Sequence, residues 1–224
     1  MNNPERFWDR AASGYDSADE RPDEAQLRML QKTRKYLNAR DVVLDFGCAT
    51  GANALELAGY VGHIEGIDIS SKMIELATDR AIERGIKNAT FQQATLPDAP
   101  YEAGTFDVVM AFNVLHLLDD RRTVIQRIAD LLKPGGYFIS ITPCLKEKKS
   151  FATSLTIPFL EGMMKLGLLP DMLTRLSMAD LEYLIAIDQF EVVETEAIFQ
   201  SVTEYFMVVR KGLPDAHQQP GKPS

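Results

Sequence analysis

Short apolar runs alternate with longer amphipathic runs along the chain. The strand-like and helix-like runs, in order, cover 41–46, 52–60, 63–69, 70–84, 89–93, 106–111, 120–132 and 136–142. Buried parallel strands need continuous apolar runs, and each parallel pair needs a crossover connection, which is usually a helix. The pattern therefore predicts an α/β fold of βαβ units with right-handed crossovers and helices on both faces of the sheet.

The C-terminal third departs from this alternation. A helix-like run at 177–187 is followed by two strand-like runs, 190–196 and 202–209, with no helix between them. Two consecutive strands without a crossover predict a hairpin, here Phe190–Glu194 against Tyr205–Val209. We therefore expect a seven-stranded, mostly parallel sheet whose last strand is antiparallel.

The segment most informative about function is the bend after the first strand. The apolar run ends in Asp45 and opens into Gly47-Cys48-Ala49-Thr50-Gly51 before the next helix. A tight strand-to-helix turn needs small residues where its backbone approaches a ligand. The next strand ends in Asp68, at about the 20-residue distance after the turn that is typical of a ribose-binding carboxylate.

This bend resembles motif I of the class I S-adenosylmethionine-dependent methyltransferases, in which an acid is followed by three glycines at alternate positions. Asp45, Gly47 and Gly51 fit that motif, and Ala49 takes the middle place. The dinucleotide fingerprint G-x-G-x-x-G fits less well, because only Gly47 is a glycine in the three required places. The bend therefore favours S-adenosylmethionine over NAD.

Two further features agree with this family. The turn Leu132-Lys133-Pro134-Gly135-Gly136 is similar to one that the family carries before its fifth strand, and it marks the fold rather than the chemistry. The order of strands and helices is also similar, so the resemblance implies a Rossmann-like sheet. The motif resemblance spans about 40–145, with a looser match to 210.

The resemblance implies roles for the residues of the bend. Backbone N–H groups of Cys48, Ala49 and Gly51 would approach the methionine part of the cofactor, and Asp45 would hold its amino group. Asp68 would accept hydrogen bonds from both ribose hydroxyls, which the carboxylate charge strengthens. The alternative for Asp68 is an N-cap or ordinary loop acid ahead of the helix.

The adenine site is expected farther along the chain. Gln93 stands where the family has an acid that accepts from the adenine amino group, and an amide can both accept and donate there. Ala94 would use its backbone N–H, while Leu96 and Met73 would sandwich the ring. The rest of the expected cofactor-binding set is Ile69, Thr95, Asn113 and Val114, the last two acting through their backbone carbonyls.

Methyl transfer by in-line displacement needs an aligned acceptor, a dry pocket and, for O–H or N–H acceptors, a base. His116 is the candidate base because imidazole titrates near neutral pH and this residue follows the fourth strand. The alternative is that His116 only packs.

Tyr15 is the second catalytic candidate. The segment 1–38 resembles the N-terminal helical cap of the ubiquinone and biotin biosynthesis methyltransferases, in which Tyr15, Phe7 and Trp8 would face the pocket. Alternatively, these aromatic residues staple a helix, expected after Pro22, to the core.

The remaining boundaries follow from the resemblance and, for the lid and the tail, from composition. Residues 39–211 form the expected methyltransferase domain, with an apolar, methionine-bearing lid at 145–176 that suggests an acceptor with a hydrophobic body. The alternative is that this apolar stripe packs against the sheet or against another subunit of a homo-oligomer. The tail 212–224, rich in proline, glycine and glutamine, is expected to be disordered.

Charge and cysteine content exclude several function classes. The net charge of the 224 residues is −8, so we expect no nucleic-acid partner. The two cysteines, Cys48 and Cys144, support neither a disulfide framework nor a zinc site, and no metal site is expected. Without a secretory apolar segment or an apolar run of membrane-spanning length, we expect a cytoplasmic protein with reduced thiols.

The sequence thus predicts an S-adenosylmethionine-dependent methyltransferase that transfers a methyl group to a small-molecule acceptor. Two alternatives remain at this point. One is a noncatalytic module that binds S-adenosylmethionine as a sensor or partner subunit, and the other is a nucleotide-dependent oxidoreductase on a related sheet.

Overall fold

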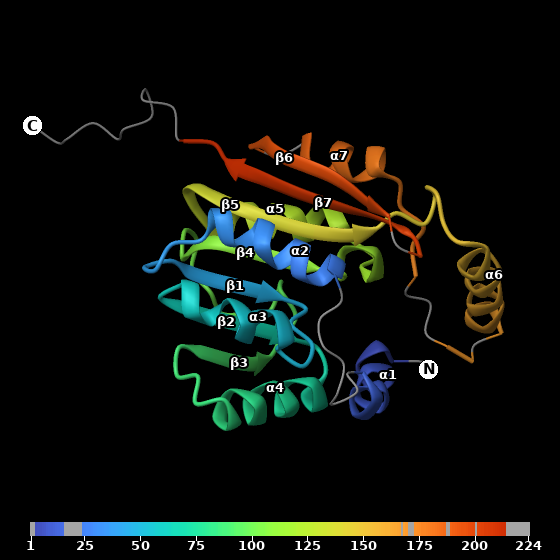
Figure 1. Cartoon of the computed structure of the whole chain (residues 1–224), viewed down its shortest axis with the longest axis horizontal. Helices are drawn as coiled ribbons and strands as arrows, with labels where there is room; N and C mark the ends of the chain where they lie inside the picture. Colours follow the sequence, from blue (N-terminus) through green and yellow to red (C-terminus); the bar gives the residue numbers. More distant parts are fainter. Residues whose placement is uncertain are drawn as a thin grey trace, which may run out of the picture.

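The computed structural model describes residues 3–15, 24–166, 168–169, 173–186, 189–199 and 201–213. Within them lies a seven-stranded sheet with the strand order β3-β2-β1-β4-β5-β7-β6 (Figure 1). The strands are β1 (Val42–Phe46), β2 (His63–Asp68), β3 (Ala89–Gln93), β4 (Phe106–Phe112), β5 (Leu132–Pro143), β6 (Phe190–Phe199) and β7 (Thr203–Lys211).

Strand directions confirm the predicted hairpin. The pairs from β3 through β5 are parallel, whereas β7 pairs antiparallel with both β5 and β6. The predicted α/β sheet, mostly parallel with an antiparallel last strand, is therefore confirmed. The strand order reverses between β1 and β4, and open α/β sheets bind ligands outside the carboxyl ends of the strands at such a switch point.

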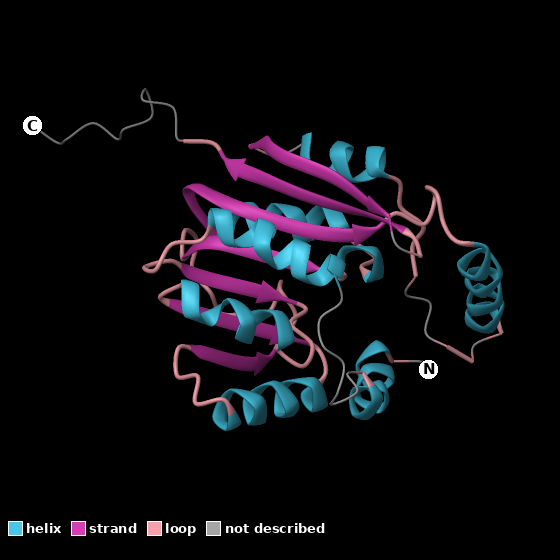
Figure 2. Ribbon diagram, in the orientation of Figure 1, coloured by secondary structure: helices cyan, strands magenta, loops and turns pink. Residues whose placement is uncertain are grey.

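Helices cover both faces of the sheet, as expected (Figure 2). They are α1 (Pro4–Ala11), α2 (Glu24–Thr33), α3 (Ala52–Leu57), α4 (Ser71–Glu83), α5 (Arg121–Leu131), α6 (Phe151–Lys165) and α7 (Met178–Ala186). One core cluster joins the sheet to α2, α3 and α4, and the other joins it to α5 and α7. These two apolar layers fix the carboxyl ends of the strands that form the site.

The N-terminal segment divides into two parts with different neighbours. In α1, the Asp9 carboxylate accepts hydrogen bonds from Ser70 Oγ (2.7 Å) and Lys72 N (3.2 Å) at the start of α4. By contrast, α2 places Met29 and Leu30 in the core, although the sequence assigned all of 1–38 to a cap outside it. The residues between these two helices, 16–23, lie outside the described part.

Helix α6, in the segment between β5 and α7, lies away from the sheet, whereas Cys144 and Leu176 of the same segment are buried in the core. Figure 1 shows α6 beyond the ends of β5 and β7, and among its described side chains only Ile157 is buried. The expected disordered tail falls largely on 214–224, which lies outside the described residues. None of the helices in the described ranges has the length and apolar character needed to cross a bilayer.

The predicted turn before the fifth strand is confirmed in its main feature. Helix α5 ends at Leu131, and Gly135 has a φ of +78°, a left-handed conformation that glycine adopts readily. Leu132 pairs with Phe106, and Tyr137 pairs with Val108, so the residues between form an irregularity at the start of β5. This element lies at the start of β5, the end opposite to the carboxyl ends of the strands that form the site.

Candidate functional site

A cleft lies at the switch point, outside the carboxyl ends of β1 and β4. It has two adjoining lobes of about 310 and 120 Å³ that share Tyr15, Gly47, Ala49, Phe112 and Asn113. The larger, polar lobe is lined also by Gln26, Asp45, Asn53 and Glu204. The smaller, apolar lobe is lined also by Asp68, Ile69, Met73, Val114 and Leu118.

In the bend after β1, every second residue has a left-handed backbone conformation. Gly47, Ala49 and Gly51 have φ values of +73°, +47° and +75°. A Cβ at Gly51 would lie 2.9 Å from the Phe91 ring and 3.0 Å from Ala77, so both backbone and packing require glycine there. Ala49 adopts the same region with a methyl group, which costs strain that a glycine would avoid.

Three N–H groups of the bend already donate hydrogen bonds within the protein. Cys48 N donates to Ile67 O (3.0 Å), Ala49 N donates to an Asp68 carboxylate oxygen (3.1 Å), and Gly51 N donates to Cys48 O (2.9 Å). This corrects the expectation that these three N–H groups would meet the cofactor. Gly47, Cys48 and Ala49 still line the cleft. Gly51 does not line it and instead packs against Phe91 and Ala77.

Asp45 is the unusual ionisable group of the polar lobe. Its side chain is buried, with only 2% of the residue exposed, and no described residue donates a hydrogen bond to its carboxylate. Burial, together with the charge of Asp68, raises the pKa of Asp45 to about 7. A ligand ammonium group would supply the missing countercharge. The site therefore fits a cofactor that carries a cationic amine.

Asp68 fixes the other side of the bend. One carboxylate oxygen accepts from Ala49 N (3.1 Å), and the other accepts from Ser70 N (2.9 Å). Burial raises the pKa of Asp68, and these backbone hydrogen bonds oppose that rise. Each oxygen keeps a second lone pair for a ligand hydroxyl. Asp68 is not the N-cap of α4, because Ser70 takes that position and accepts from Met73 N.

The apolar lobe contains part of the expected adenine site. Ile69, Met73, Ala94 and Val114 line it, together with Phe46, Leu117 and Leu118, which the sequence analysis did not single out. Leu96 has no exposed surface and belongs to the core, so the expectation that it sandwiches the ring with Met73 is wrong. Val114 and Leu118 line the lobe together with Met73.

Gln93 and its neighbours form an outer groove beside the apolar lobe. The Gln93 amide nitrogen donates to Ile69 O (2.9 Å) and to a Glu5 carboxylate oxygen (3.1 Å), and Ala94 N donates to Asp68 O (3.0 Å). These bonds correct the expectation that Ala94 N–H and the Gln93 amide nitrogen donate to adenine. They do not involve the Gln93 amide oxygen, whose expected role as acceptor for the adenine amino group stays a prediction. Thr95 lines this groove rather than the lobe, and donates to Asp98.

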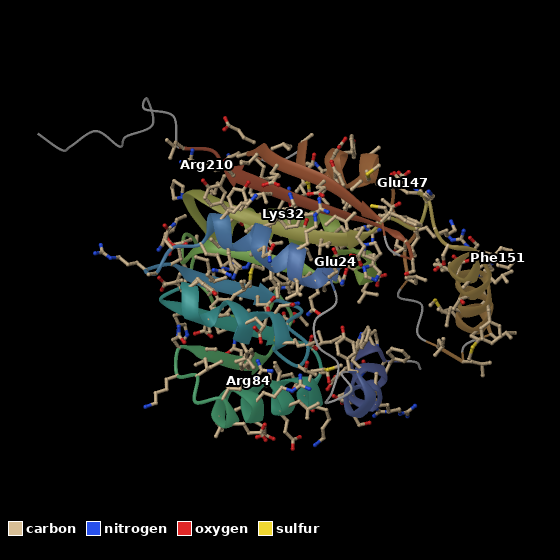
Figure 3. All side chains as sticks on the ribbon, viewed as in Figure 1. Glu24, Lys32, Arg84, Glu147, Phe151 and Arg210 are labelled. Atoms are coloured by element: carbon tan, nitrogen blue, oxygen red, sulfur yellow. The ribbon has the colours of Figure 1, made fainter. Side chains whose placement is uncertain are left out.

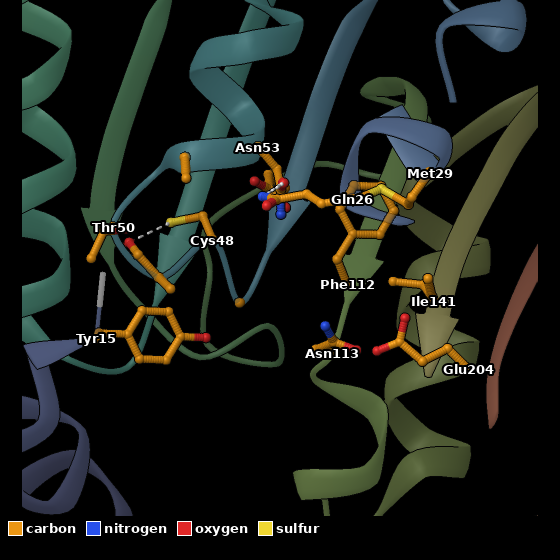
Figure 4. Close-up of a pocket in the computed structure, with 14 residues that line it drawn as sticks. Tyr15, Gln26, Met29, Cys48, Thr50, Asn53, Phe112, Asn113, Ile141 and Glu204 are labelled. Atoms are coloured by element: carbon orange, nitrogen blue, oxygen red, sulfur yellow. Dashed lines mark hydrogen bonds between the residues drawn. The ribbon is translucent and has the colours of Figure 1, made fainter. Parts of the chain in front are cut away.

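Asn113 stands between the two lobes. Figure 4 shows it with Glu204 on the opposite side of the cavity from Tyr15. Its φ is +55°, and among the described residues other than glycine, Ala49 and Asn113 are the two with positive φ. Both line the cleft, and strained backbone often accompanies ligand sites. A Cβ at Gly47 would lie 2.8 Å from Val114, so glycine lets the bend approach this strand end.

The two expected catalytic residues have different positions. Tyr15 lines both lobes of the cleft, as expected, and packs edge-to-face on Trp8 of α1, with 5.9 Å between ring centroids. His116 lines a separate cavity beneath α6, and burial lowers its pKa to about 4. The structure therefore moves the expected base out of the cleft.

Comparison with known proteins identifies the family. A family model described as a methyltransferase domain matches residues 37–169. The chain belongs to this methyltransferase domain family. The matched region contains the bend, Asp45, Asp68 and Asn113, and therefore most of the cleft.

Curated relatives of this methyltransferase domain cover about half of the chain. A 27-O-demethylrifamycin SV methyltransferase from Amycolatopsis mediterranei is 35% identical over 132 residues, 58% of this chain and 47% of its own length. A ubiquinone biosynthesis O-methyltransferase from Vibrio parahaemolyticus is 38% identical over 96 residues, 42% of this chain and 40% of its own. The chain thus spans half or less of the length of these relatives.

Solved structures share the fold of this methyltransferase domain. The YcgJ protein of Bacillus subtilis superposes with a TM-score of 0.68 at 18% identity, over 83% of this chain and 99% of that one. The cyclase SpnF superposes with a TM-score of 0.74 at 17% identity, over 93% and 95% of the two chains. At these identities the likeness concerns the fold alone.

Sequence reasoning missed the residues that complete the polar lobe of this methyltransferase domain. Gln26 donates to the Asn53 side-chain oxygen (3.0 Å), and Glu204 enters the lobe from the start of β7. Neither stands in a recognisable motif, because α2, α3 and β7 meet only in the fold. Within the described ranges, no cluster of three or more ligand-type side chains could hold a metal ion.

Proposed function

We propose that the protein is an S-adenosylmethionine-dependent methyltransferase that acts on a small-molecule acceptor. The observation that carries the proposal is the pair of acids at the tips of the neighbouring strands β1 and β2. Asp45 and Asp68 flank a bend of left-handed residues that lines both lobes of the cleft. The buried Asp45 carboxylate has no hydrogen-bond partner among the described residues, and an ammonium group would bind there.

The residues present would hold the parts of this cofactor separately. Asp45 would bind the amino group, Asp68 would accept from the ribose hydroxyls, and Met73 and Val114 would contact the two faces of the adenine. When bound, the cofactor supplies a methyl group that its sulfonium already activates. The chain therefore needs to bind, orient and exclude water rather than to activate the donor.

On the acceptor side, the chain supplies polar side chains around the larger lobe. Asn113 and Glu204 lie across it from Tyr15 (Figure 4), and Trp8 and Tyr15 cover the apolar lobe. Glu204 is a carboxylate in a position to take up the proton that an O–H or N–H acceptor releases. The relatives named for rifamycin, ubiquinone and aklanonic acid methylation support a small-molecule acceptor for this chain as well.

Calorimetry distinguishes this proposal from its alternatives. We expect the protein to bind S-adenosylmethionine and S-adenosylhomocysteine, and not NAD. A nucleotide-dependent oxidoreductase would show the reverse preference. A noncatalytic module would bind the sulfonium cofactor but release no S-adenosylhomocysteine in a metabolite screen.

The mutational test is Asp68→Ala. Loss of this carboxylate should weaken S-adenosylhomocysteine binding by about 2 kcal/mol or more, because ribose hydroxyls and two backbone N–H groups lose their acceptor. The matched control is Asp98→Ala, an exposed acid of the outer groove, which should leave the affinity unchanged. Equal affinities of wild type and Asp68→Ala in calorimetry would remove Asp68 from the binding site.

We further propose that the protein works in the cytoplasm and without a nucleic-acid partner. The net charge of −8 and the two buried free cysteines support this assignment.

A further inference from the structure

Helix α1 has two neighbouring faces with different partners. Pro4 and Trp8, four positions apart, line the apolar lobe of the cleft. Glu5 and Asp9, also four positions apart, accept hydrogen bonds from polar side chains outside that lobe. Residues four apart lie on the same face of a helix. One face of α1 therefore covers the lobe expected to hold the adenine, while the next face attaches the helix to the domain.

The polar attachment matters because α1 has little apolar packing. None of its residues is buried, and Ala12, directly after it, is the one buried residue within 3–15. Asp9 Oδ1 accepts from Ser70 Oγ (2.7 Å) and from Lys72 N (3.2 Å), a pair of hydrogen bonds that we call the Asp9 anchor. Ser70 is the N-cap of α4, so the anchor places a negative charge where the helix dipole favours it. Figure 1 shows α1 beside α4.

Ser70 connects the Asp9 anchor to the expected ribose acid, Asp68. The Ser70 N–H donates to Asp68 Oδ1 (2.9 Å), while the Ser70 hydroxyl donates to Asp9. The same hydroxyl oxygen accepts from the N–H of Met73 (3.1 Å), whose side chain lines the apolar lobe. A hydroxyl has one proton to donate, and here Asp9 receives it. One serine therefore joins α1 to two residues of the cofactor half of the cleft.

The two carboxylates on either side of Ser70 also influence each other through charge. The hydrogen bond from Ser70 lowers the pKa of Asp9, which is therefore ionised at neutral pH. Burial is the main cause of the raised pKa of Asp68, and the charge of Asp9 adds to it. Ligand hydroxyls that donate to Asp68 would offset this repulsion. Ligand binding at Asp68 and the docked position of α1 therefore favour each other, because such coupling is reciprocal.

Given the proposed methyltransferase function, we propose that Asp9 is a positioning residue that holds α1 over the apolar lobe and so controls the release of S-adenosylhomocysteine. Asp9 itself lines neither lobe and acts through Ser70 and the backbone of α4. An adenine in the lobe would contact Pro4 and Trp8 and supply the apolar packing that α1 lacks. Because α1 forms part of the wall of this lobe, breaking the Asp9 anchor speeds the departure of the ligand.

Fluorescence of the ligand-free protein tests the anchor without any cofactor. The chain contains a single tryptophan, Trp8, so its emission reports on α1 alone. Asp9→Ala should shift this emission to longer wavelength, because an undocked ring is more exposed to water. The matched control is Asp79→Ala, which removes an exposed acid of α4 and should leave the emission unchanged. Because α1 contributes no residue to the two core clusters, both variants should keep the wild-type urea midpoint.

Surface plasmon resonance with the immobilised full chain tests the anchor with S-adenosylhomocysteine bound. Asp9→Ala should raise the dissociation rate constant about tenfold, since two hydrogen bonds to a charged acceptor are lost. Asp9→Asn keeps an acceptor oxygen in place, so its rate constant should lie within about threefold of wild type. The combined effect of Asp9→Ala and Ser70→Ala should be smaller than the product of the single effects, because both remove the same hydrogen bond.

Wild-type emission and a wild-type dissociation rate constant in Asp9→Ala would overturn the proposal, as would equal changes in Asp79→Ala. Effects of Asp9→Ala and Ser70→Ala that simply multiply would overturn it too, because the two residues would then act independently. Failure of the proposed function has a different signature. A wild-type protein that does not bind S-adenosylhomocysteine, while Asp9→Ala still shifts the Trp8 emission, would refute the methyltransferase function and leave the Asp9 anchor of α1 established.

Discussion

The two halves of the site are built in different ways. The cofactor half takes Asp45, the bend and Asp68 from one β1-α3-β2 unit, where backbone hydrogen bonds lock each part to the next. The acceptor half joins Tyr15, Asn113 and Glu204, which are distant along the chain. The first half depends on local geometry, and the second on how separate elements pack.

The halves also differ in how firmly side chains are enclosed. Met73 of the cofactor half is 1% exposed, whereas Phe151 and Phe159 of α6 are 81% and 67% exposed. Figure 3 shows Phe151 on α6, away from the sheet. Side chains of the cofactor half are therefore more firmly enclosed than these two side chains of α6. The predictions below test whether the cofactor half has this fixed, strained character.

The largest expected effect concerns Asp45. Its pKa is about 7 in the folded protein and about 3.8 without the fold, so the folded state holds the extra proton between these values. Stability should therefore fall as pH rises from about 4 to 7. Asp45→Asn removes this loss, so urea unfolding at pH 8 should show a variant more stable than wild type by on the order of 4 kcal/mol.

The same variant should lose affinity for the cofactor. The asparagine amide cannot neutralise a ligand ammonium group, so S-adenosylhomocysteine binding should weaken while stability rises. Urea unfolding at pH 4 provides the internal control, because wild type and Asp45→Asn should then have similar stability. A difference that does not change between pH 4 and pH 8 would contradict the assigned titration.

The next effect concerns the glycine at the end of the bend. Gly51→Ala should lower the free energy of unfolding by about 2 kcal/mol, because the new Cβ meets Phe91 at 2.9 Å in a backbone with φ of +75°. Gly59→Ala is the matched control, since nothing lies within 4 Å of its Cβ position. Similar urea midpoints for the two variants would show that the bend is not packed as described.

The smallest effect has the opposite sign. Ala49→Gly should stabilise the protein by about 1 kcal/mol, because glycine adopts the φ of +47° at this position without the penalty that alanine carries. Ala52→Gly, within α3, should instead destabilise by about 1 kcal/mol. Thermal unfolding of the two variants and the wild type measures whether each substitution raises or lowers the stability. Destabilisation by Ala49→Gly would mean that the methyl group makes a contact worth more than its strain.

The sequence determined the fold and the cofactor half because both depend on local patterns. Alternating apolar and amphipathic runs fix the strands and their crossovers, and acids at strand ends are carried to one edge of a parallel sheet by its geometry. For this reason Asp45, Asp68 and the bend stand where the pattern predicted them. Their hydrogen bonds were less predictable, since the N–H groups of Cys48 and Ala49 turned inward to Ile67 and Asp68.

Only the tertiary structure decided the acceptor half. Leu96 and His116 are adjacent to site motifs along the chain, but packing buried one in the core and turned the other toward a different cavity. Glu204 enters the cleft because β7 returns antiparallel beside β5, a contact between residues about sixty positions apart in sequence. Side-chain direction at such junctions depends on the packing of several elements at once, and no local pattern in the chain encodes it.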